Sequence, residues 1–168
     1  MLAISGQLDA TPFGPYVATR QTAVGEVVVN PQDAGARRRS VYLQQRRSQT
    51  LSMLKVFDAP AIATVCTTRP SSTVPLQSLS LLNSDFAVAT AEAFAKRLRT
   101  ETDGTDAALI QRAWLLAIAR APTANEQRIA AEFLAGQQAQ YTGEQAAEWG
   151  LADFCQMLLA SNSFLYQE

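Results

Sequence analysis

The amino-acid sequence predicts a mainly α-helical protein of the α+β class, in which a small β hairpin and loop arm at the N-terminal side packs on a C-terminal antiparallel helical bundle. Two observations predict this class. From Pro75 onward, apolar residues recur at helical spacing, and helix start and stop signals agree with that spacing. Before Pro75 the chain is rich in proline and glycine and holds one short β-branched run at 27–29. We therefore expect a loop-rich arm over residues 1–74 and a helical bundle over residues 75–168.

The arm is expected to contain two short strands and one helix. The β-branched run predicts a strand over about 26–30. Residues 40–46 alternate apolar and polar side chains, which predicts a second strand, and the two strands could pair as a hairpin. Near-helical spacing predicts a helix over about 49–57, which ends before Pro60.

The bundle is expected to contain five helices connected by short turns, which favour antiparallel neighbours. Thr105 is a predicted N-cap, and Thr123 with Glu126 forms a capping-box signal at the start of the fourth helix. The last helix is apolar nearly all round, so we expect it to be central. The expected helices cover about 76–82, 84–100, 106–119, 124–141 and 144–160.

Composition excludes several classes of function. The chain has a formal net charge of −1 and 17% charged residues, which does not favour a nucleic-acid partner. It contains no histidine, so a Ser-His-Asp triad, a Cys-His pair, a histidine zinc site and a histidine-ligated haem are excluded. We expect no catalytic, cofactor-binding or metal-binding residue in this chain, and no membrane span, because no run of about 18 apolar residues occurs.

The first six residues are typical of the last turn of a helix that ends at a glycine, here Gly6. They lack the basic and then apolar order of a signal peptide. We therefore expect the chain to be a piece of a longer protein.

Five arginines lie within eleven positions and form the densest charge feature: Arg37, Arg38, Arg39, Arg46 and Arg47. Their guanidinium groups could bind phosphate or carboxylate. The alternative is that they flank a strand, either solvated or paired with acidic residues.

The two cysteines, Cys66 and Cys155, leave two alternatives open. Cys66 lies in a hydroxyl-rich loop near Arg69, where a cation could activate a thiolate, although capping and turn formation explain such loops better. Cys155 lies on an apolar helix face and suits a small core residue. The pair could also form a disulfide if the chain is exported.

Several strings together resemble the family called domain of unknown function 1553. Two later segments are similar to the family's closing motifs, at 116–126 and 153–166, with Ala119 where glycine is usual and with Ala160 and Ser163 as departures. The earlier strings are Arg38-Arg39-Ser40-Val41-Tyr42-Leu43, Phe57-Asp58-Ala59-Pro60, Cys66, Arg69, Ser72-Thr73-Val74-Pro75-Leu76-Gln77-Ser78-Leu79 and Leu81-Leu82-Asn83-Ser84.

The resemblance implies the C-terminal part of a large exported protein of planctomycetes and related bacteria, periplasmic or at the cell surface, behind a cytochrome c domain that holds the haem elsewhere. It implies no activity. We hypothesise that its recurrent polar residues form a buried hydrogen-bonded network that docks the helices onto the arm. These residues are Arg38, Arg39, Arg69, Thr73, Gln77 and Asn83.

Three hypotheses for function follow. The first is a structural or interaction module without its own catalysis, which contacts other domains of the parent protein. The second is a carbohydrate or anionic-polymer binding module that uses the arginine run with the rings of Tyr42 and Trp114. The third is part of an enzyme whose site is completed by other sequence, with Cys66 and Arg69 lining an open cleft.

Overall fold

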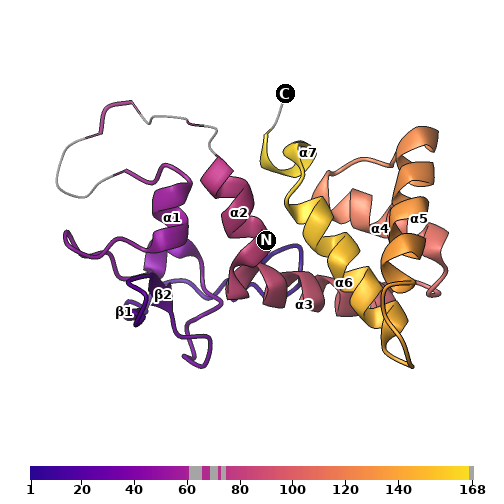
Figure 1. The fold of residues 1–168 in the computed structure, drawn as a ribbon. Helices are drawn as coiled ribbons and strands as arrows, with labels where there is room; N and C mark the ends of the chain where they lie inside the picture. Colours follow the sequence, from indigo (N-terminus) through magenta and orange to yellow (C-terminus); the bar gives the residue numbers. More distant parts are fainter. Residues whose placement is uncertain (61–65, 69–71, 73–74, 167–168) are drawn as a thin grey trace. The chain divides into compact units, whose positions relative to one another are not determined.

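A computed structural model of the chain describes residues 1–60, 66–68, 72 and 75–166 (Figure 1). The chain divides into two compact units, which we call the helical unit (Met1–Gln7 and Leu81–Glu168) and the hairpin unit (Leu8–Ser80). The predicted class is confirmed, because the described residues form α-helices and one two-stranded antiparallel sheet. The division differs from the expected one, since the first seven residues belong with the helices and the boundary falls at Ser80.

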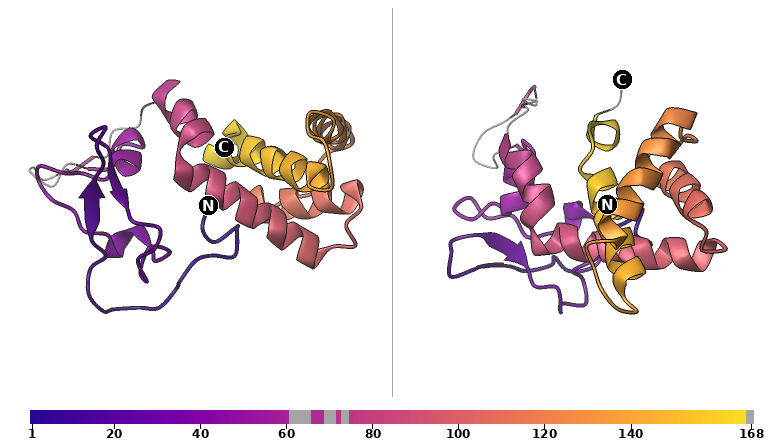
Figure 2. Two further views of the ribbon diagram at one scale, coloured as in Figure 1. Left: turned by 60° about the horizontal axis from the view of Figure 1, so that its bottom comes forward. Right: turned by 45° about the vertical axis from the view of Figure 1, so that its right-hand side comes forward.

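The sheet of the hairpin unit pairs β1 (Thr19–Gln21) with β2 (Val27–Val29), as the left view of Figure 2 shows. In the register, Thr19 lies opposite Val29 and Gln21 lies opposite Val27. The intervening turn is closed by hydrogen bonds between Thr22 and Glu26. The short helix α1 (Ser52–Val56) packs on β2, and the Ser52 hydroxyl accepts a hydrogen bond from the Val27 amide at 2.9 Å.

The strand expected over residues 40–46 is wrong. The structure has a short 3₁₀ helix there, η1 (Ser40–Tyr42), with i to i+3 hydrogen bonds from the amides of Tyr42 and Leu43. The alternation of apolar and polar residues gave a wrong prediction because Val41 is exposed, so its apolar side chain does not mark a buried face of a strand. The true partner of β2 is the polar segment β1, in which no apolar alternation signals a strand.

The helical unit contains the end of α2 (Pro75–Asn83) and then α3 (Asp85–Glu101), α4 (Asp106–Ala117), α5 (Ala124–Gln138), α6 (Ala146–Leu159) and α7 (Asn162–Leu165). Helix α6 packs against both α3 and α5, so it is central, as its apolar composition predicted (Figure 1). The core that these helices share includes the fully buried side chains of Phe94, Leu98, Ile110, Leu134, Leu151 and Phe154.

Side-chain caps fix the starts of the long helices. Thr105 caps α4, and Thr123 with Glu126 forms the predicted capping box at the start of α5. Ser84 caps α3 in the same way, by accepting a hydrogen bond from the Ala87 amide. Helix α6 begins at Ala146, and its N-cap residue Gln145 makes no side-chain capping hydrogen bond.

The capping box predicts a pH dependence. The guanidinium of Arg120 and the backbone amide of Thr123, at 2.6 and 2.7 Å from the carboxylate, lower the pKa of Glu126 to about 2. Because the folded-state pKa is depressed, the carboxylate stabilises the fold above about pH 4.5, and this stabilisation is lost as the pH falls toward 2. Thermal melts should show Glu126→Gln below wild type at pH 7 and level with it near pH 2.

The matched control is Glu132→Gln, which removes an exposed ion pair with Arg128. Exposed pairs contribute little, so this variant should melt close to wild type at both pH values. A gap between Glu126→Gln and wild type that stayed constant from pH 7 to pH 2 would contradict the assignment.

The residue after the C-cap of α4 is Ala119, and its backbone conformation accounts for the glycine that the resembled family usually has there. Ala119 has a φ of 61°, in the left-handed region that glycine adopts without a Cβ penalty. We predict that Ala119→Gly stabilises the helical unit by roughly 0.5–1 kcal/mol, measured by denaturant unfolding. The control Ala135→Gly, on the exposed face of α5, should destabilise it by about 1 kcal/mol. An Ala119→Gly variant less stable than wild type would refute the explanation.

Residues 1–7 form a turn that closes as the sequence predicts. Gly6 has a φ of 74°, the Gln7 amide donates to Leu2 O at 2.9 Å and the Gly6 amide donates to Ala3 O at 3.3 Å. This pattern is a Schellman motif, the usual glycine end of a helix.

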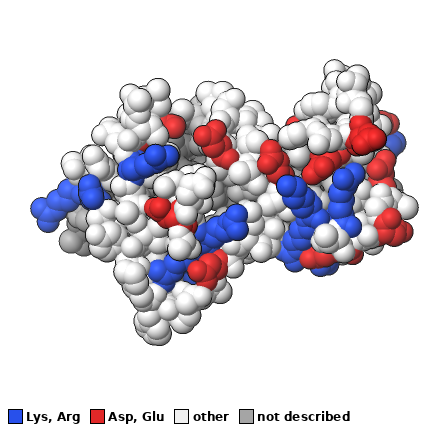
Figure 3. Space-filling model, turned by 90° about the horizontal axis from the view of Figure 1, so that it is seen from below, with Lys and Arg blue, Asp and Glu red and all other residues white. Residues whose placement is uncertain are grey.

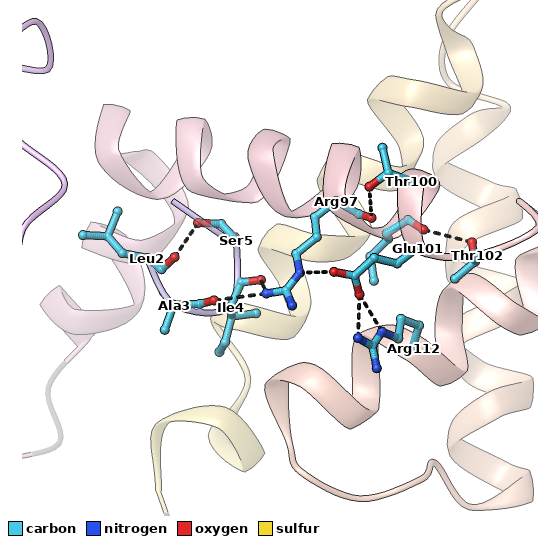
Figure 4. A network of polar contacts seen from close by, with 10 residues as sticks. Leu2, Ala3, Ile4, Ser5, Arg97, Thr100, Glu101, Thr102 and Arg112 are labelled. Atoms are coloured by element: carbon cyan, nitrogen blue, oxygen red, sulfur yellow. Dashed lines mark hydrogen bonds and ion pairs between the residues drawn. The ribbon is translucent and has the colours of Figure 1, made fainter. Parts of the chain in front are cut away.

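The guanidinium of Arg97 on α3 holds this turn (Figure 4). Its Nη1 atom donates to the carbonyl oxygens of Ala3 and Ile4 at 3.1 and 2.8 Å. Glu101 accepts hydrogen bonds from Arg97 at 2.6 Å and from Arg112 of α4 at 2.7 Å. One carboxylate therefore links the N-terminal turn, α3 and α4.

Candidate functional site

The candidate site is a loop of the hairpin unit, residues 11–16, which we call the aromatic loop. Two backbone bridges close it. Before the loop, a parallel β-bridge joins the backbones of Asp9 and Arg38, and the Asp9 amide donates to Arg37 O at 2.9 Å. After the loop, the Val17 amide donates to Tyr42 O at 2.8 Å. Both ends of the loop are thus fixed to the same segment of chain.

Arg38 donates hydrogen bonds to backbone carbonyl groups of the aromatic loop. Its Nη1 atom donates to Pro15 O at 2.9 Å, and its Nη2 atom donates to the carbonyl oxygens of Thr11, at 3.4 Å, and of Phe13. The guanidinium also lies over the Tyr42 ring, 3.9 Å from the ring centre, in a cation–π contact. One side chain therefore bonds alternate carbonyl groups along the loop.

Tyr42 bonds the Phe13 amide, whereas Arg38 bonds the Phe13 carbonyl. The Tyr42 hydroxyl accepts a hydrogen bond from the Phe13 amide at 3.0 Å. Phe13 has a φ of 60°, a conformation that costs an L-residue roughly 1–2 kcal/mol and that the bonds from Arg38 and Tyr42 stabilise. Such strain concentrates at functional positions.

Asp9 contributes a further hydrogen bond at the start of the loop. Its carboxylate accepts from the Thr11 amide at 2.9 Å. Hydrogen bonds from the hydroxyl and amide of Thr11 lower the pKa of Asp9, and the charge of Arg38 acts in the same direction. The carboxylate therefore stays ionised, and the turn stays closed, at neutral pH.

The bonded loop presents two aromatic side chains to solvent. Phe13 is 83% exposed and Tyr16 is 66% exposed, although their backbone is held in place. Exposed rings on an ordered backbone are typical of binding hot spots, because little conformational entropy is lost when they are covered. The rings fill no place in the core and are available to a partner.

The hairpin unit is also basic. It holds eight Lys and Arg residues against four Asp and Glu, a net charge of +4, whereas the helical unit holds six against eleven, a net charge of −5. Ion pairs between described residues all lie in the helical unit, where Figure 3 shows acidic and basic side chains intermingled on the right of the view. The exposed arginines beside the aromatic loop have no described carboxylate partner: Arg37, Arg39, Arg46 and Arg47.

A second polar cluster of the hairpin unit surrounds Asp58. This residue has a φ of 57°, and its carboxylate accepts hydrogen bonds from the Ser72 amide at 2.7 Å and hydroxyl at 2.8 Å. The buried side chain of Gln77 donates to Ser72 O at 3.0 Å and to Val56 O at 3.1 Å. The cluster thus links the chain after α1 to the start of α2.

The residues of the hypothesised network lie in different places. Arg38 bonds the aromatic loop and Gln77 bonds the Asp58 cluster, so their described hydrogen bonds go to different groups. Arg39 and Asn83 are exposed. Arg69 and Thr73 lie outside the described residues, so the docking role of the set stays a prediction.

Both cysteines are free thiols in the structure. Cys66 is exposed, and its thiol donates to Thr68 O at 3.2 Å. Cys155 is fully buried in the core of the helical unit, where desolvation raises the pKa of its thiol above the usual value. Burial therefore keeps Cys155 protonated and unreactive.

The expectation that Trp114 offers a ring to a carbohydrate is wrong. Its side chain lies in the core of the helical unit and stacks on Phe154, with ring centres 6.1 Å apart. Tyr42 is also engaged, because Arg38 covers its face. In the hairpin unit, the exposed rings are those of Phe13 and Tyr16, for which the run Thr11-Pro12-Phe13-Gly14-Pro15-Tyr16 was the available signal.

The helical unit carries an open groove of about 600 Å³ on α5 and α6. Its lining includes Leu82, Phe133, Met157 and Asp153, and the Asp153 carboxylate accepts a hydrogen bond from the Tyr141 hydroxyl at 2.8 Å. The described residues hold no cluster of three side chains able to bind a metal ion. Within the same part of the chain, every helix is too short or too polar to cross a membrane.

Fold and site together define a mainly helical protein with a basic, hairpin-bearing unit that presents an ordered aromatic loop. The family model of the proteins of unknown function DUF1553 (PSD1) matches residues 1–134. The chain therefore belongs to the DUF1553 family, as its motifs indicated. Comparison with curated proteins gave no match, and comparison with solved structures gave none either.

Proposed function

We propose that the chain is a non-catalytic interaction module that contacts its partner through the aromatic loop. The observation that carries the proposal is the Phe13 backbone, which Arg38 and Tyr42 hold in a left-handed conformation while its ring stays 83% exposed. Both hydrogen bonds hold the Phe13 backbone and leave its side chain uncovered, which supports a role in presenting the ring.

The wider setting of the proposal comes from the family resemblance. The module would be the C-terminal part of a large exported bacterial protein of planctomycete type, in the periplasm or at the cell surface. Haem would belong to a separate cytochrome c domain of that protein. Two classes of partner are then open to the aromatic loop: the other domains of that parent protein, and an extracellular polysaccharide.

Hydroxyl-radical footprinting of the intact parent protein in its native cell envelope, compared with the purified chain, tests the proposal. Oxidation of Phe13 and Tyr16 should fall several-fold in the native setting, because a partner covers their rings. Val24, which is also 83% exposed but lies in the turn of the hairpin, is the control and should react equally in both. Equal oxidation of Phe13 and Tyr16 in both samples would overturn the proposal.

A further inference from the structure

We infer that the surface formed by the aromatic loop and its neighbouring arginines binds an acidic polysaccharide, one that carries carboxylate or sulfate groups. The inference rests on the proposed function, since it names the partner of the same loop. Three features of the hairpin unit carry it: the exposed rings, the arginines on either side of them and the charge of the unit.

The rings supply the apolar half of the recognition. A sugar ring has C–H groups on its faces and polar groups on its edge, so it packs on an aromatic face while its edge stays hydrated. Phe13 and Tyr16 are three residues apart on a loop whose carbonyls are bonded to Arg38. A backbone held in this way suits a repeating ligand, because the loop does not have to rearrange when the rings are covered.

The arginines supply the charged half. Parallel bridges from Asp9 to Arg38 and from Val17 to Leu43 place the segment 38–43 alongside the aromatic loop. Arg37 and Arg39 therefore lie level with the beginning of the loop, and Arg46 and Arg47 follow its end. Exposed guanidinium groups bind carboxylate or sulfate through paired N–H donors.

The arrangement favours a linear ligand with spaced charges. Exposed arginines adjoin the segment paired with the start of the loop and recur beyond the bridge at its end, a spacing that suits a chain in which anionic groups alternate with packable rings. A duplex nucleic acid is not favoured, because the whole chain has a net charge of −1 and the helical unit has −5. An acidic polysaccharide satisfies both the rings and the arginines.

Isothermal titration calorimetry with polygalacturonate, dextran sulfate and neutral dextran tests the inference on the purified chain. We expect saturable binding to at least one of the two acidic polymers and none to neutral dextran. The double variant Phe13→Ser with Tyr16→Ser should weaken binding at least tenfold at both 50 and 300 mM salt. Arg37→Ala with Arg39→Ala should weaken it several-fold at 50 mM salt and reduce the salt dependence.

Arg128→Ala is the matched control, since this arginine is exposed on α5 of the helical unit, and it should bind as wild type does. Circular dichroism melts of all variants establish that each is folded. Absence of binding to both acidic polymers would overturn the inference. Equal affinity for oligothymidylate or polyglutamate, weakened by the same substitutions, would also overturn it, because charge alone would then explain the binding.

The two proposals fail separately. If both polymers fail to bind while footprinting shows Phe13 and Tyr16 protected in the parent protein, the partner is a protein and only the polysaccharide inference falls. If the rings are unprotected in the native envelope, the interaction module itself is refuted.

Discussion

Replacing Phe154 by alanine should lower the free energy of unfolding of the helical unit by roughly 3–5 kcal/mol. Phe154 lies on the central helix α6, is fully buried and stacks on Trp114. Its removal loses the transfer free energy of the ring and leaves a cavity among helices that pack on α6 from two sides. Urea unfolding, followed by the fluorescence of Trp114 and Trp149, measures the change.

Phe86→Ala is the control, because this ring lies on the exposed side of α3. Its substitution should cost less than about 1 kcal/mol, as surface changes usually do. If the two variants lost similar stability, Phe154 would not be the centre of the core.

Replacing Gly150 by alanine should cost roughly 2–3 kcal/mol, although alanine is the better helix former. A Cβ atom at Gly150 would lie 2.8 Å from the backbone nitrogen and 2.9 Å from the Cα of Gln138, the last residue of α5. Backbone atoms cannot move aside as a flexible side chain can, so α6 would have to shift away from α5. Thermal unfolding of the variant measures the loss.

Gly136→Ala is the matched control and should act in the opposite direction. A Cβ atom at this position on α5 meets nothing within 4 Å, so only helix propensity changes. We expect a gain of about 1 kcal/mol. A stable Gly150→Ala variant would show that α5 and α6 do not approach as closely as the structure has them.

The helical unit could be predicted from sequence where local rules decide. Capping residues such as Thr105 and Thr123 mark helix starts because they satisfy free amides of their own first turn. The pairing of α3 with α6 could not be predicted, since it joins residues far apart in the chain. It depends on which apolar faces fit together, and periodicity does not encode that.

The hairpin unit was harder to predict because its short segments depend on their neighbours. Strand β1 is polar, so only its pairing with β2 identifies it. Residues 40–46 have an alternating pattern, yet Val41 faces solvent and the segment turns as a 3₁₀ helix. A strand of a few residues buries too little surface for its pattern to be decisive.

The candidate site was predicted only in part. Arg38 and Tyr42 stood out by charge and by motif, but their shared role in holding the loop needs contacts across more than 20 positions of the sequence. Phe13 and Tyr16 were missed, because exposure of a ring is a tertiary property. The departure at Ala119 was visible in the sequence, and the left-handed backbone there accounts for the usual glycine.

The central claim is that Arg38 orders the aromatic loop so that its rings are presented to a partner. Amide ¹⁵N relaxation of residues 11–16 tests it in wild type, in Arg38→Ala and in the neighbouring control Arg37→Ala. We predict order parameters near about 0.85 in wild type and the control, and below about 0.6 in Arg38→Ala. A wild-type loop already below about 0.6, or an Arg38→Ala loop as ordered as wild type, would contradict the claim.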